Sequence, residues 1–318
     1  MPELPEVETM RRGIAGVVGA RIVGVERAPC PRKPIEVTPS AGVIARRVVG
    51  RRIERTDRVG KRVVVWLDSD EALVFEPRMT GLVLVTDPPD PLYSRLRVVL
   101  EHDGQGRGAS APGSARGSKR EKGNIARNAT PRQSRGLKDG GSRPTELLYW
   151  DRRGLGNVRL VTRRQFDERY GLHVLGPDAL VMTAELYRER LGKSARAVKV
   201  ALLDQKAVAG IGNLYASEIL HLAEVHPARA CRRVTRAQWE RIATAALEVL
   251  ETAIRYEGST LSDGTYRNAL NKAGGYQNEH RVYDKAGQRC PRRGCGGAVA
   301  RIVQAQRATF FCPGCQKR

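Results

Sequence analysis

The residues best suited to chemistry stand at the start of the chain, where Pro2 is followed by Glu3. If Met1 is removed, Pro2 presents a secondary amine, a small nucleophile that can condense with an aldehyde carbon and accept electrons. An α-amino group has a pKa of about 7.7–8.0, so roughly a tenth of it is free base at neutral pH. Glu3 places a proton donor and acceptor one residue away. Many proteins begin Met-Pro because proline suits the first turn of a helix, so the rest of the chain must decide.

A second group of reactive side chains lies at the other end, where four of the six cysteines fall within residues 290–318. A disulfide framework would spread its cysteines more evenly and would need an oxidising compartment. Two close pairs of thiolates fit one structural, tetrahedral Zn²⁺. The first pair has four intervening residues and the second has two; the expected ligands are Cys290, Cys295, Cys312 and Cys315. Between the pairs, residues 301–311 predict two short strands, with Arg307 near their turn and suited to a phosphate.

A third feature is a helix, a glycine-rich turn and a second helix over residues 198–218. The free N–H groups at a helix N-terminus bind anions, and Asn213 could add its side-chain amide to the same phosphate. A Gly-x-Gly turn alone is weak evidence, because helical hairpins are common.

The bulk composition points to a polyanionic partner. The 318 residues suffice for two domains with cores, and the net charge is +22. Counterion release makes nucleic acid the leading candidate, with an anionic membrane surface as the competitor. No apolar stretch is long enough to cross a bilayer, and three glutamates within the first eight residues interrupt any signal sequence. A cytosolic protein is therefore expected.

Apolar periodicity predicts a mixed fold. Residues 5–19 predict a helix, and runs that alternate or stay apolar predict strands at 21–25, 43–49, 62–67, 72–75, 82–85, 96–100 and 146–150. These strands favour a β-sandwich or barrel with a helix attached. Beyond residue 174 the pattern becomes helical, at 183–191, 195–204, 214–222 and 236–256, the last capped by Thr235.

Residues 103–144 interrupt the strand pattern. This segment has no aromatic residue and contains ten Lys/Arg against three Asp/Glu. It cannot bury enough apolar surface to fold alone, which predicts a disordered basic insertion between two strands. It is either a tolerated loop or an additional tether for DNA. Most of the positive charge lies outside it.

Three segments in the same order along the chain resemble one family. They are Met-Pro-Glu-Leu-Pro-Glu-Val-Glu-Thr at the start, Gly-Ile-Gly-Asn-Leu-Tyr-Ala-Ser-Glu in the helical part, and Gln-Arg-Ala-Thr-Phe-Phe-Cys-x2-Cys near the end. The chain is similar to the formamidopyrimidine-DNA glycosylases, also called 8-oxoguanine DNA glycosylases, from end to end except for the insertion.

The resemblance implies a DNA glycosylase and AP lyase. Pro2 would attack C1′ of the damaged nucleotide and form a Schiff base with the opened sugar, while Glu3 would protonate that sugar. The 3′ and then the 5′ phosphate would leave by β,δ-elimination, after the target base has been flipped out of the duplex. Lys61 matches the family's strand lysine that faces the phosphates of the lesion.

The resemblance also implies residues that bind substrate and DNA. Glu6 corresponds to a pocket carboxylate, and Glu218 to a second acidic residue in the helix-turn-helix region. Phosphate contacts are expected from Lys199, Asn213 and Arg307.

Two loops are implied to enter the base stack. Met79 corresponds to the wedge that fills the gap left by the flipped base, and Arg153 to the arginine that holds the orphaned cytosine. Leu155 departs from the usual wedge phenylalanine. Glu76 replaces a common histidine and would repel phosphate unless Arg78 pairs with it. The first cysteine pair is two residues wider than usual in the family.

The expected architecture is an α+β fold in three parts. An N-terminal β-sandwich with its N-terminal helix spans residues 1–172, a helix-two-turn-helix domain spans 173–281, and a zinc-finger ribbon spans 282–318. One structural Zn²⁺ is expected, and the partner is damaged double-stranded DNA bound in the cleft between the two larger parts. We expect a monomer with no membrane contact, in the cytoplasm and associated with the nucleoid.

Two other functions stay open at this point. An endonuclease VIII-like enzyme for oxidised pyrimidines usually begins Pro-Glu-Gly-Pro, whereas Leu4 and the Arg153 loop favour the purine branch. A non-catalytic protein that binds damaged DNA would keep the helix-turn-helix and zinc finger but would need neither Pro2 nor Glu3. A ribosomal or RNA-binding protein would explain the charge and the zinc but not the N-terminus.

Overall fold

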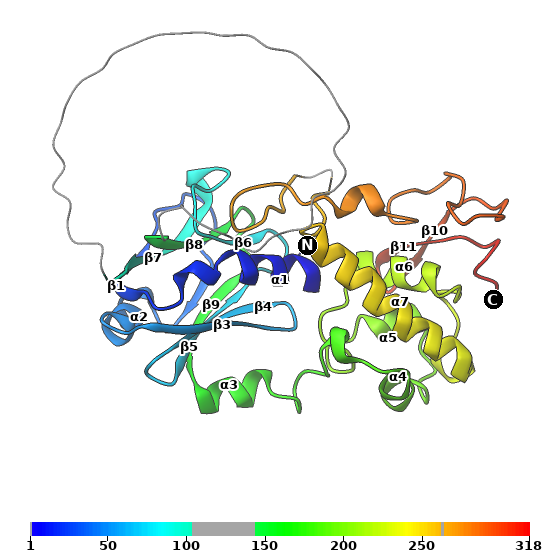
Figure 1. Ribbon diagram of the computed structural model, residues 1–318, viewed down its shortest axis with the longest axis horizontal. Helices are drawn as coiled ribbons and strands as arrows, with labels where there is room; N and C mark the ends of the chain where they lie inside the picture. The colour runs from blue at the N-terminus through cyan, green and yellow to red at the C-terminus, as the bar shows by residue number, and fades with distance from the viewer. Residues whose placement is uncertain (1, 104–143, 262–263) are drawn as a thin grey trace, which may run out of the picture.

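The computed structural model describes residues 2–103, 144–261 and 264–318, and places two sheets in one half of the molecule and most of the helices in the other (Figure 1). The basic insertion expected over 103–144 lies, apart from its two ends, outside the described residues. No helix in the part of the chain that the structure describes is both long and apolar enough to span a membrane.

The sheet half is a sandwich. One sheet has the order β2-β9-β5-β4-β3 and the other β1-β7-β8-β6, and only the β2–β9 pair is parallel. The strands of the first sheet are β2 Glu36–Thr38, β9 Asn157–Thr162, β5 Glu71–Glu76, β4 Arg62–Leu67 and β3 Ile53–Val59. Those of the second are β1 Arg21–Arg27, β7 Ser94–Glu101, β8 Glu146–Asp151 and β6 Gly81–Leu84. Alternate side chains from both sheets, such as Val63 and Leu96, share one buried core.

The first helix, α1 Leu4–Gly13, joins the two halves and is followed by a 3₁₀ turn over Ala15–Val17. Leu4 packs into the apolar core of the helical half, whereas Val7 and Met10 pack into the core of the sandwich. In Figure 1 the N-terminal end of α1 accordingly lies where the sheets meet the helices. The first residues of the chain are therefore fixed between the two halves.

The prediction of a strand over 43–49 is wrong, because α2 occupies Ala41–Val48. Ile44 and Val48 are buried four residues apart, while Arg46 and Arg47 are exposed. A strand would have placed Arg46 on the same buried face as Ile44 and Val48, whereas the helix buries both apolar residues and leaves Arg46 exposed. The sequence analysis also did not identify β2, β3, β9 or the short helix α3 Arg163–Tyr170.

The helical half matches the expected elements more closely. It contains α4 Ala184–Leu191, α5 Val198–Leu202, α6 Asn213–Leu222 and α7 Arg236–Arg255. The predicted cap of α7 is confirmed, since the Thr235 hydroxyl and the Gln238 amide each accept the other residue's backbone N–H. The helix expected over 195–204 is shorter than predicted.

Short 3₁₀ turns connect elements in both halves. One precedes β7 in the sandwich, at Pro91–Tyr93, and the others lie at Ala179–Val181, Cys231–Arg233 and Tyr276–Glu279.

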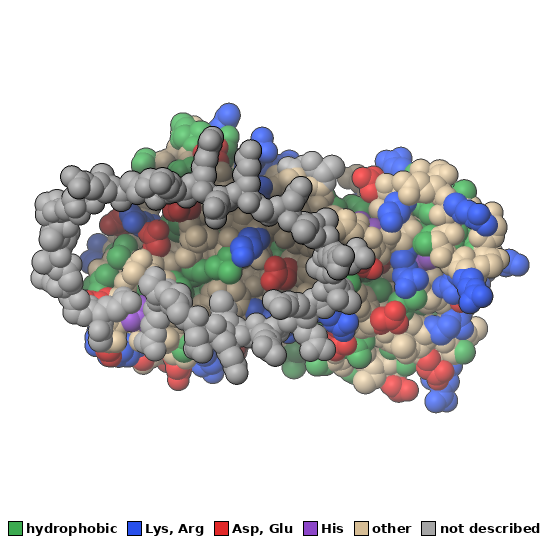
Figure 2. Space-filling model, turned by 45° about the horizontal axis from the view of Figure 1, so that its top comes forward, with side chains coloured by type: hydrophobic (Ala, Val, Ile, Leu, Met, Phe, Trp, Pro, Cys, Tyr) green, Lys and Arg blue, Asp and Glu red, His purple; other side chains and the backbone are tan. Residues whose placement is uncertain are grey.

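The C-terminal ribbon is confirmed as two antiparallel strands, β10 Ala300–Gln304 and β11 Arg307–Phe311. Arg307 is the first residue of β11 and is exposed beside the two-residue turn. β11 packs against α6. Figure 2 shows several Lys and Arg side chains gathered at the end of the molecule that carries this ribbon.

Leu4→Ala tests whether α1 joins the two halves. Leu4 is fully buried in the helical core, so we expect a loss of about 2–5 kcal/mol in the free energy of unfolding, measured by urea denaturation. Val18→Ala removes a half-exposed apolar side chain just beyond α1 and should change stability by less than about 0.5 kcal/mol. Equal effects of the two substitutions would contradict the joining role of Leu4.

Candidate active site

The buried carboxylate of Glu6 holds the N-terminus in place. Its Oε2 accepts the backbone N–H of Glu3 at 2.8 Å, which closes a capping box on α1. Its Oε1 accepts the hydroxyl of Tyr215 at 2.5 Å and the N–H of Ser259 at 2.9 Å. Burial and the neighbouring carboxylate of Glu3 raise the pKa of Glu6. One side chain therefore ties the start of the chain to α6 and to the loop after α7.

Glu3 is docked on the N-terminus of α6. Its Oε1 accepts the N–H of Leu214 at 3.0 Å, whereas its buried Oε2 has no hydrogen-bond partner among the described residues. Pro2 is buried next to it, and Met1 lies outside the described residues. Glu3 thus keeps one oxygen that can exchange a proton with a bound molecule.

The Gly-Ile-Gly turn over residues 210–212 contacts Glu3 and Leu4 and holds them in place. A Cβ on Gly212 would lie 2.2 Å from the Glu3 carboxyl carbon, so only glycine lets that carboxylate reach the helix N-terminus. Gly210 has a φ of +108° and accepts the N–H of Leu4 at 3.1 Å through its carbonyl. The turn therefore positions Glu3 and Leu4 and also begins α6.

A cavity of about 470 Å³ opens beside these residues. Glu3 and Glu6 form part of its wall, Met79 comes from the sandwich, and Arg307 from the ribbon. The loop after α7 completes it with Ser259, Leu261, Thr265 and Tyr266. Sequence analysis missed this loop and Tyr215. The only signal would have been tyrosines within an otherwise Gly- and Ser-rich stretch.

Cations and an amide gather next to the cavity. The Nζ of Lys199 donates to the Asn213 side chain at 2.5 Å, and the Nδ2 of Asn213 donates to the carbonyl of Ala308 at 3.0 Å. Burial and the nearby Arg307 lower the pKa of Lys199 to about 8. Burial also lowers the pKa of Lys61, while Glu3 and Glu6 act in the opposite direction. The structure thus brings together most of the predicted phosphate-binding residues and both carboxylates.

Glu218 lies elsewhere. It is fully buried in α6, and its carboxylate accepts the N–H groups of Arg281, Val282 and Tyr283 at 2.7–3.0 Å. These three hydrogen bonds connect Glu218 to the segment that leads into the zinc-finger region. The geometry corrects the expectation of a substrate or DNA contact: Glu218 anchors that segment to α6.

The two predicted stack-entering loops lie side by side at the ends of β6 and β8. Met79 is 36% exposed and Leu155 44% exposed, and Arg153 is exposed as well. The Glu76 carboxylate, which could repel phosphate, is paired with Arg78 at 3.0 Å and with Arg62 at 3.3 Å. The pairing with Arg78, which the sequence analysis left as a condition, is present in the structure.

The four C-terminal thiols fit one zinc ion. Their Sγ atoms all lie within 4.8 Å of one another, with Cys290 to Cys315 at 3.9 Å and Cys295 to Cys312 at 3.6 Å. Tetrahedral zinc with Zn–S bonds of about 2.3 Å separates its sulfurs by roughly 3.8 Å. Cys290, Cys295, Cys312 and Cys315 would hold the ion as a closed structural site, which leaves no position for catalysis.

The wide first cysteine pair, residues 290–295, contains an arginine that attaches it to α6. Arg292, inside that pair, donates to the carbonyls of His221 and Leu222 at 3.1 Å and pairs with Glu224 at 2.7 Å. The ring of His221 also contacts the Cys290 sulfur at 3.3 Å. The longer loop is therefore attached to the C-terminal end of α6.

Comparison with known proteins agrees with this arrangement. Residues 1–110 match the formamidopyrimidine-DNA glycosylase N-terminal domain, residues 175–265 the H2TH domain of the same enzyme, and residues 287–318 a zinc finger found in FPG and IleRS. A formamidopyrimidine-DNA glycosylase of Chloroflexus aurantiacus is 33% identical over 99% of this chain and 98% of its own length.

Solved structures are similar over the whole chain. MutM (Fpg) of Thermus thermophilus has a TM-score of 0.75 and 33% identity, covering 99% of this chain and 98% of its own. A Lactococcus lactis Fpg variant in complex with DNA that contains Fapy-dG has a TM-score of 0.76 and 28% identity, with both chains fully covered.

The pKa of Lys199 predicts a pH dependence of DNA binding. A bound phosphate favours the charged form of the Lys199 amine. In the free protein this amine loses its proton above about pH 8, so DNA binding at higher pH must take up a proton. We expect the affinity for duplex DNA to fall as pH rises from 7.5 to 9.5 at constant salt, measured by fluorescence anisotropy. Lys199→Met should bind more weakly at pH 7 and show a flatter pH dependence, whereas exposed Lys193→Met should retain the wild-type slope. An unchanged slope in Lys199→Met would contradict this role.

The contact of His221 with Cys290 predicts an effect on the metal. A hydrogen bond to a ligating thiolate stabilises a zinc site, and loss of such a partner typically lowers metal affinity about 10–100-fold. We expect one zinc per chain in the wild type and faster release to a chelating dye from His221→Phe. Exposed His173→Phe is the matched control. Equal release rates would show that the contact does not support the metal.

Proposed function

The chain belongs to the formamidopyrimidine-DNA glycosylase family, and we propose that it removes oxidised purines from duplex DNA and then cuts the strand as an AP lyase. The substrates would be 8-oxoguanine and formamidopyrimidines, and the pathway base excision repair. The observation that carries the proposal is the docking of residues 2 and 3 beside the 470 Å³ cavity, held by the carboxylate of Glu6 and the N-terminus of α6.

The chemistry follows from a free amine on Pro2. Its nitrogen forms a bond to C1′ of the flipped nucleotide as the bond from C1′ to the base breaks, and the base leaves with a proton. Protonation of the ring oxygen opens the sugar and gives an iminium on Pro2. Glu3 is suited to that proton transfer, because its Oε2 is buried and unpaired. The iminium acidifies C2′: a base takes the C2′ proton, the C–H electron pair forms an enamine, and the enamine expels the 3′ phosphate and restores the iminium. Loss of the C4′ proton then expels the 5′ phosphate in the same way, and water hydrolyses the iminium to release the sugar remnant and free Pro2.

The surrounding residues would bind the DNA. Lys199, Asn213 and Arg307 would contact phosphates beside the lesion, with Lys61 facing the same group from the β3–β4 turn. Met79 and Leu155 would occupy the space of the flipped base, and Arg153 would hold its former partner. The exposure of these last three side chains and the position of Met79 in the cavity wall support this assignment.

The zinc finger would support the same interface. Its four cysteines hold one structural Zn²⁺, and the ribbon between them carries Arg307 to the cavity. The proposed domains are residues 1–172, 173–281 and 282–318, since the sandwich, the helices and the ribbon each have an apolar cluster of their own. We place the protein in the cytoplasm at the nucleoid, where its DNA substrate would lie.

Pro2→Gly tests the nucleophile. Borohydride reduces the iminium, so wild type incubated with a duplex that contains 8-oxoguanine opposite cytosine should form a covalent adduct. Peptide mass mapping should place that adduct on Pro2 with Met1 removed. We expect Pro2→Gly to bind the duplex with similar affinity and to lose at least about 100-fold in trapping.

Pro89→Gly is the matched control, because Pro89 is an exposed loop proline away from the cavity, and it should behave as wild type. Undiminished strand cleavage by Pro2→Gly would overturn the mechanism. A duplex with an oxidised pyrimidine, run in parallel, distinguishes the endonuclease VIII-like alternative. Tight binding with no adduct on any lesion would identify a non-catalytic binding protein.

A further inference from the structure

A further buried carboxylate, that of Asp151, supports the loops that carry Met79, Arg153 and Leu155. Asp151, the last residue of β8, is 0% exposed and pairs in the sheet with Gly81 of β6. Its Oδ1 accepts the hydroxyl of Thr80 and the N–H of Arg153 at 3.1 Å, and its Oδ2 accepts the N–H of Gly156 at 2.8 Å.

These bonds connect two separate segments of the chain. Thr80, which follows Met79, is also buried, and its Oγ1 accepts the N–H of Arg153 at 3.0 Å. The Thr80 hydroxyl thus donates to Asp151 while it accepts from the opposite loop. The turn that presents Met79 and the turn that presents Arg153 and Leu155 therefore share one hydrogen-bonded support.

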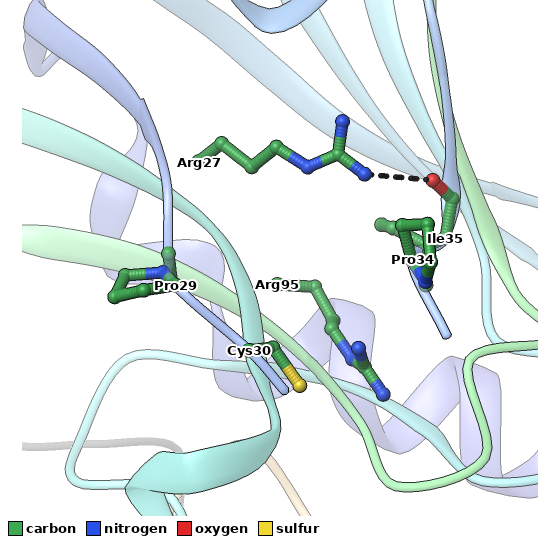
Figure 3. A pocket seen from close by; sticks show the side chains of 7 residues that line it. Arg27, Pro29, Cys30, Pro34, Ile35 and Arg95 are labelled. Carbon is green, nitrogen blue, oxygen red and sulfur yellow. Dashed lines mark hydrogen bonds between the residues drawn. The ribbon is translucent and has the colours of Figure 1, made fainter. Parts of the chain in front are cut away.

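A buried arginine fixes the backbone of the same residue. The Nε of Arg95, on β7, donates to the carbonyl of Asp151 at 2.8 Å, and its Nη1 donates to the carbonyl of Lys33 at 3.0 Å. Figure 3 shows Arg95 among the residues around a cavity of about 250 Å³, with Cys30 and Pro34 from the loop that contains Lys33. Through Arg95, Asp151 is thus also attached to the loop that contains Lys33.

The carboxylate of Asp151 cannot touch DNA, because it is fully enclosed. No ion pair to it is present among the described residues, and its charge is stabilised by two backbone N–H groups and one hydroxyl. Loss of the carboxylate would leave buried N–H groups without an acceptor, a cost that the loops can avoid only by moving.

We propose that Asp151, acting with Thr80, is a positioning residue that sets the spacing between Met79 and Arg153 and so controls selection of the base opposite the lesion. This proposal rests on the proposed function, in which those side chains enter the stack. Met79 fills the gap and Arg153 reads the orphaned base from two different loops. A fixed spacing lets both fit only when the opposite base presents its acceptors at the matching position.

The activity test compares Asp151→Asn, Thr80→Val and Thr80→Ser. The measured quantity is the single-turnover rate of 8-oxoguanine excision opposite cytosine and opposite adenine. We expect Asp151→Asn to lower the rate opposite cytosine about tenfold or more and to reduce the cytosine-to-adenine rate ratio at least about fivefold. Thr80→Val should shift the ratio in the same direction, and Thr80→Ser, which keeps the hydroxyl, should retain it. An unchanged ratio in both Asp151→Asn and Thr80→Val would overturn the proposal.

Borohydride trapping on a single-stranded abasic oligonucleotide separates selection from general damage, since that substrate has no opposite base. A loss of trapping as large as the loss of excision would assign Asp151 a merely structural role and would overturn the proposal. Absence of trapping by the wild type would instead contradict the proposed function.

Amide hydrogen exchange of the free protein tests the shared support without any activity. We expect Thr80→Val, which alters only the first loop, to accelerate exchange over residues 152–156 as well as 77–81, with Thr80→Ser as the control. Acceleration confined to 77–81 would show that the loops are independent and would overturn the proposal. This second variant keeps the test decisive if Asp151→Asn does not fold.

Discussion

The rest of the site depends on one buried acceptor, the carboxylate of Glu6. Three donors from three segments converge on it: the backbone of Glu3, the hydroxyl of Tyr215 on α6, and the N–H of Ser259 after α7. A buried carboxylate without such donors is strongly unfavourable, and each donor would be equally costly to leave unpaired. The three segments therefore have one low-energy arrangement, and that arrangement fixes a chain terminus that would otherwise fray.

Helix α6 carries this constraint to the other end of the molecule. Its N-terminus binds Glu3, and Glu218 in its middle binds the backbone of 281–283. At its C-terminal end, Arg292 of the zinc finger donates to the carbonyl of His221, and the His221 ring contacts the sulfur of Cys290. Glu3 and the ribbon that presents Arg307 are thus attached to the same helix. In the proposed reaction, a closed metal site with no position for catalysis would therefore still contribute, because it would hold Arg307 at a fixed place relative to Pro2.

Motifs with local chemistry could be predicted from the sequence, and contacts between distant segments could not. The cysteine pairs, the Thr235 cap and the ribbon turn each depend on residues close in the chain, and all were predicted. The strand assigned to 43–49 failed because Ile44 and Val48 satisfy both patterns, and only packing against the sandwich chooses the helix. Glu218 was predicted to touch substrate because it lies in a motif that resembles the family. The orientation of its side chain is set instead by residues 281–283, more than sixty residues further along the chain. The roles of Tyr215, Ser259 and Asp151 could not be predicted, because their partners are brought together only by the fold.

The electrostatics of the site favour an anionic ligand group such as a phosphate. Burial lowers the pKa of both Lys61 and Lys199, and Arg307 lowers both further, so Arg307 repels each lysine in the free protein. Glu3 opposes this repulsion at both lysines, but one of its oxygens is already engaged by α6. A phosphate placed among the cations removes the repulsion without displacing Glu3 from the helix. In the proposed reaction, binding of the DNA backbone would therefore stabilise the arrangement that holds Glu3 beside the sugar, which would couple DNA binding to the chemical step.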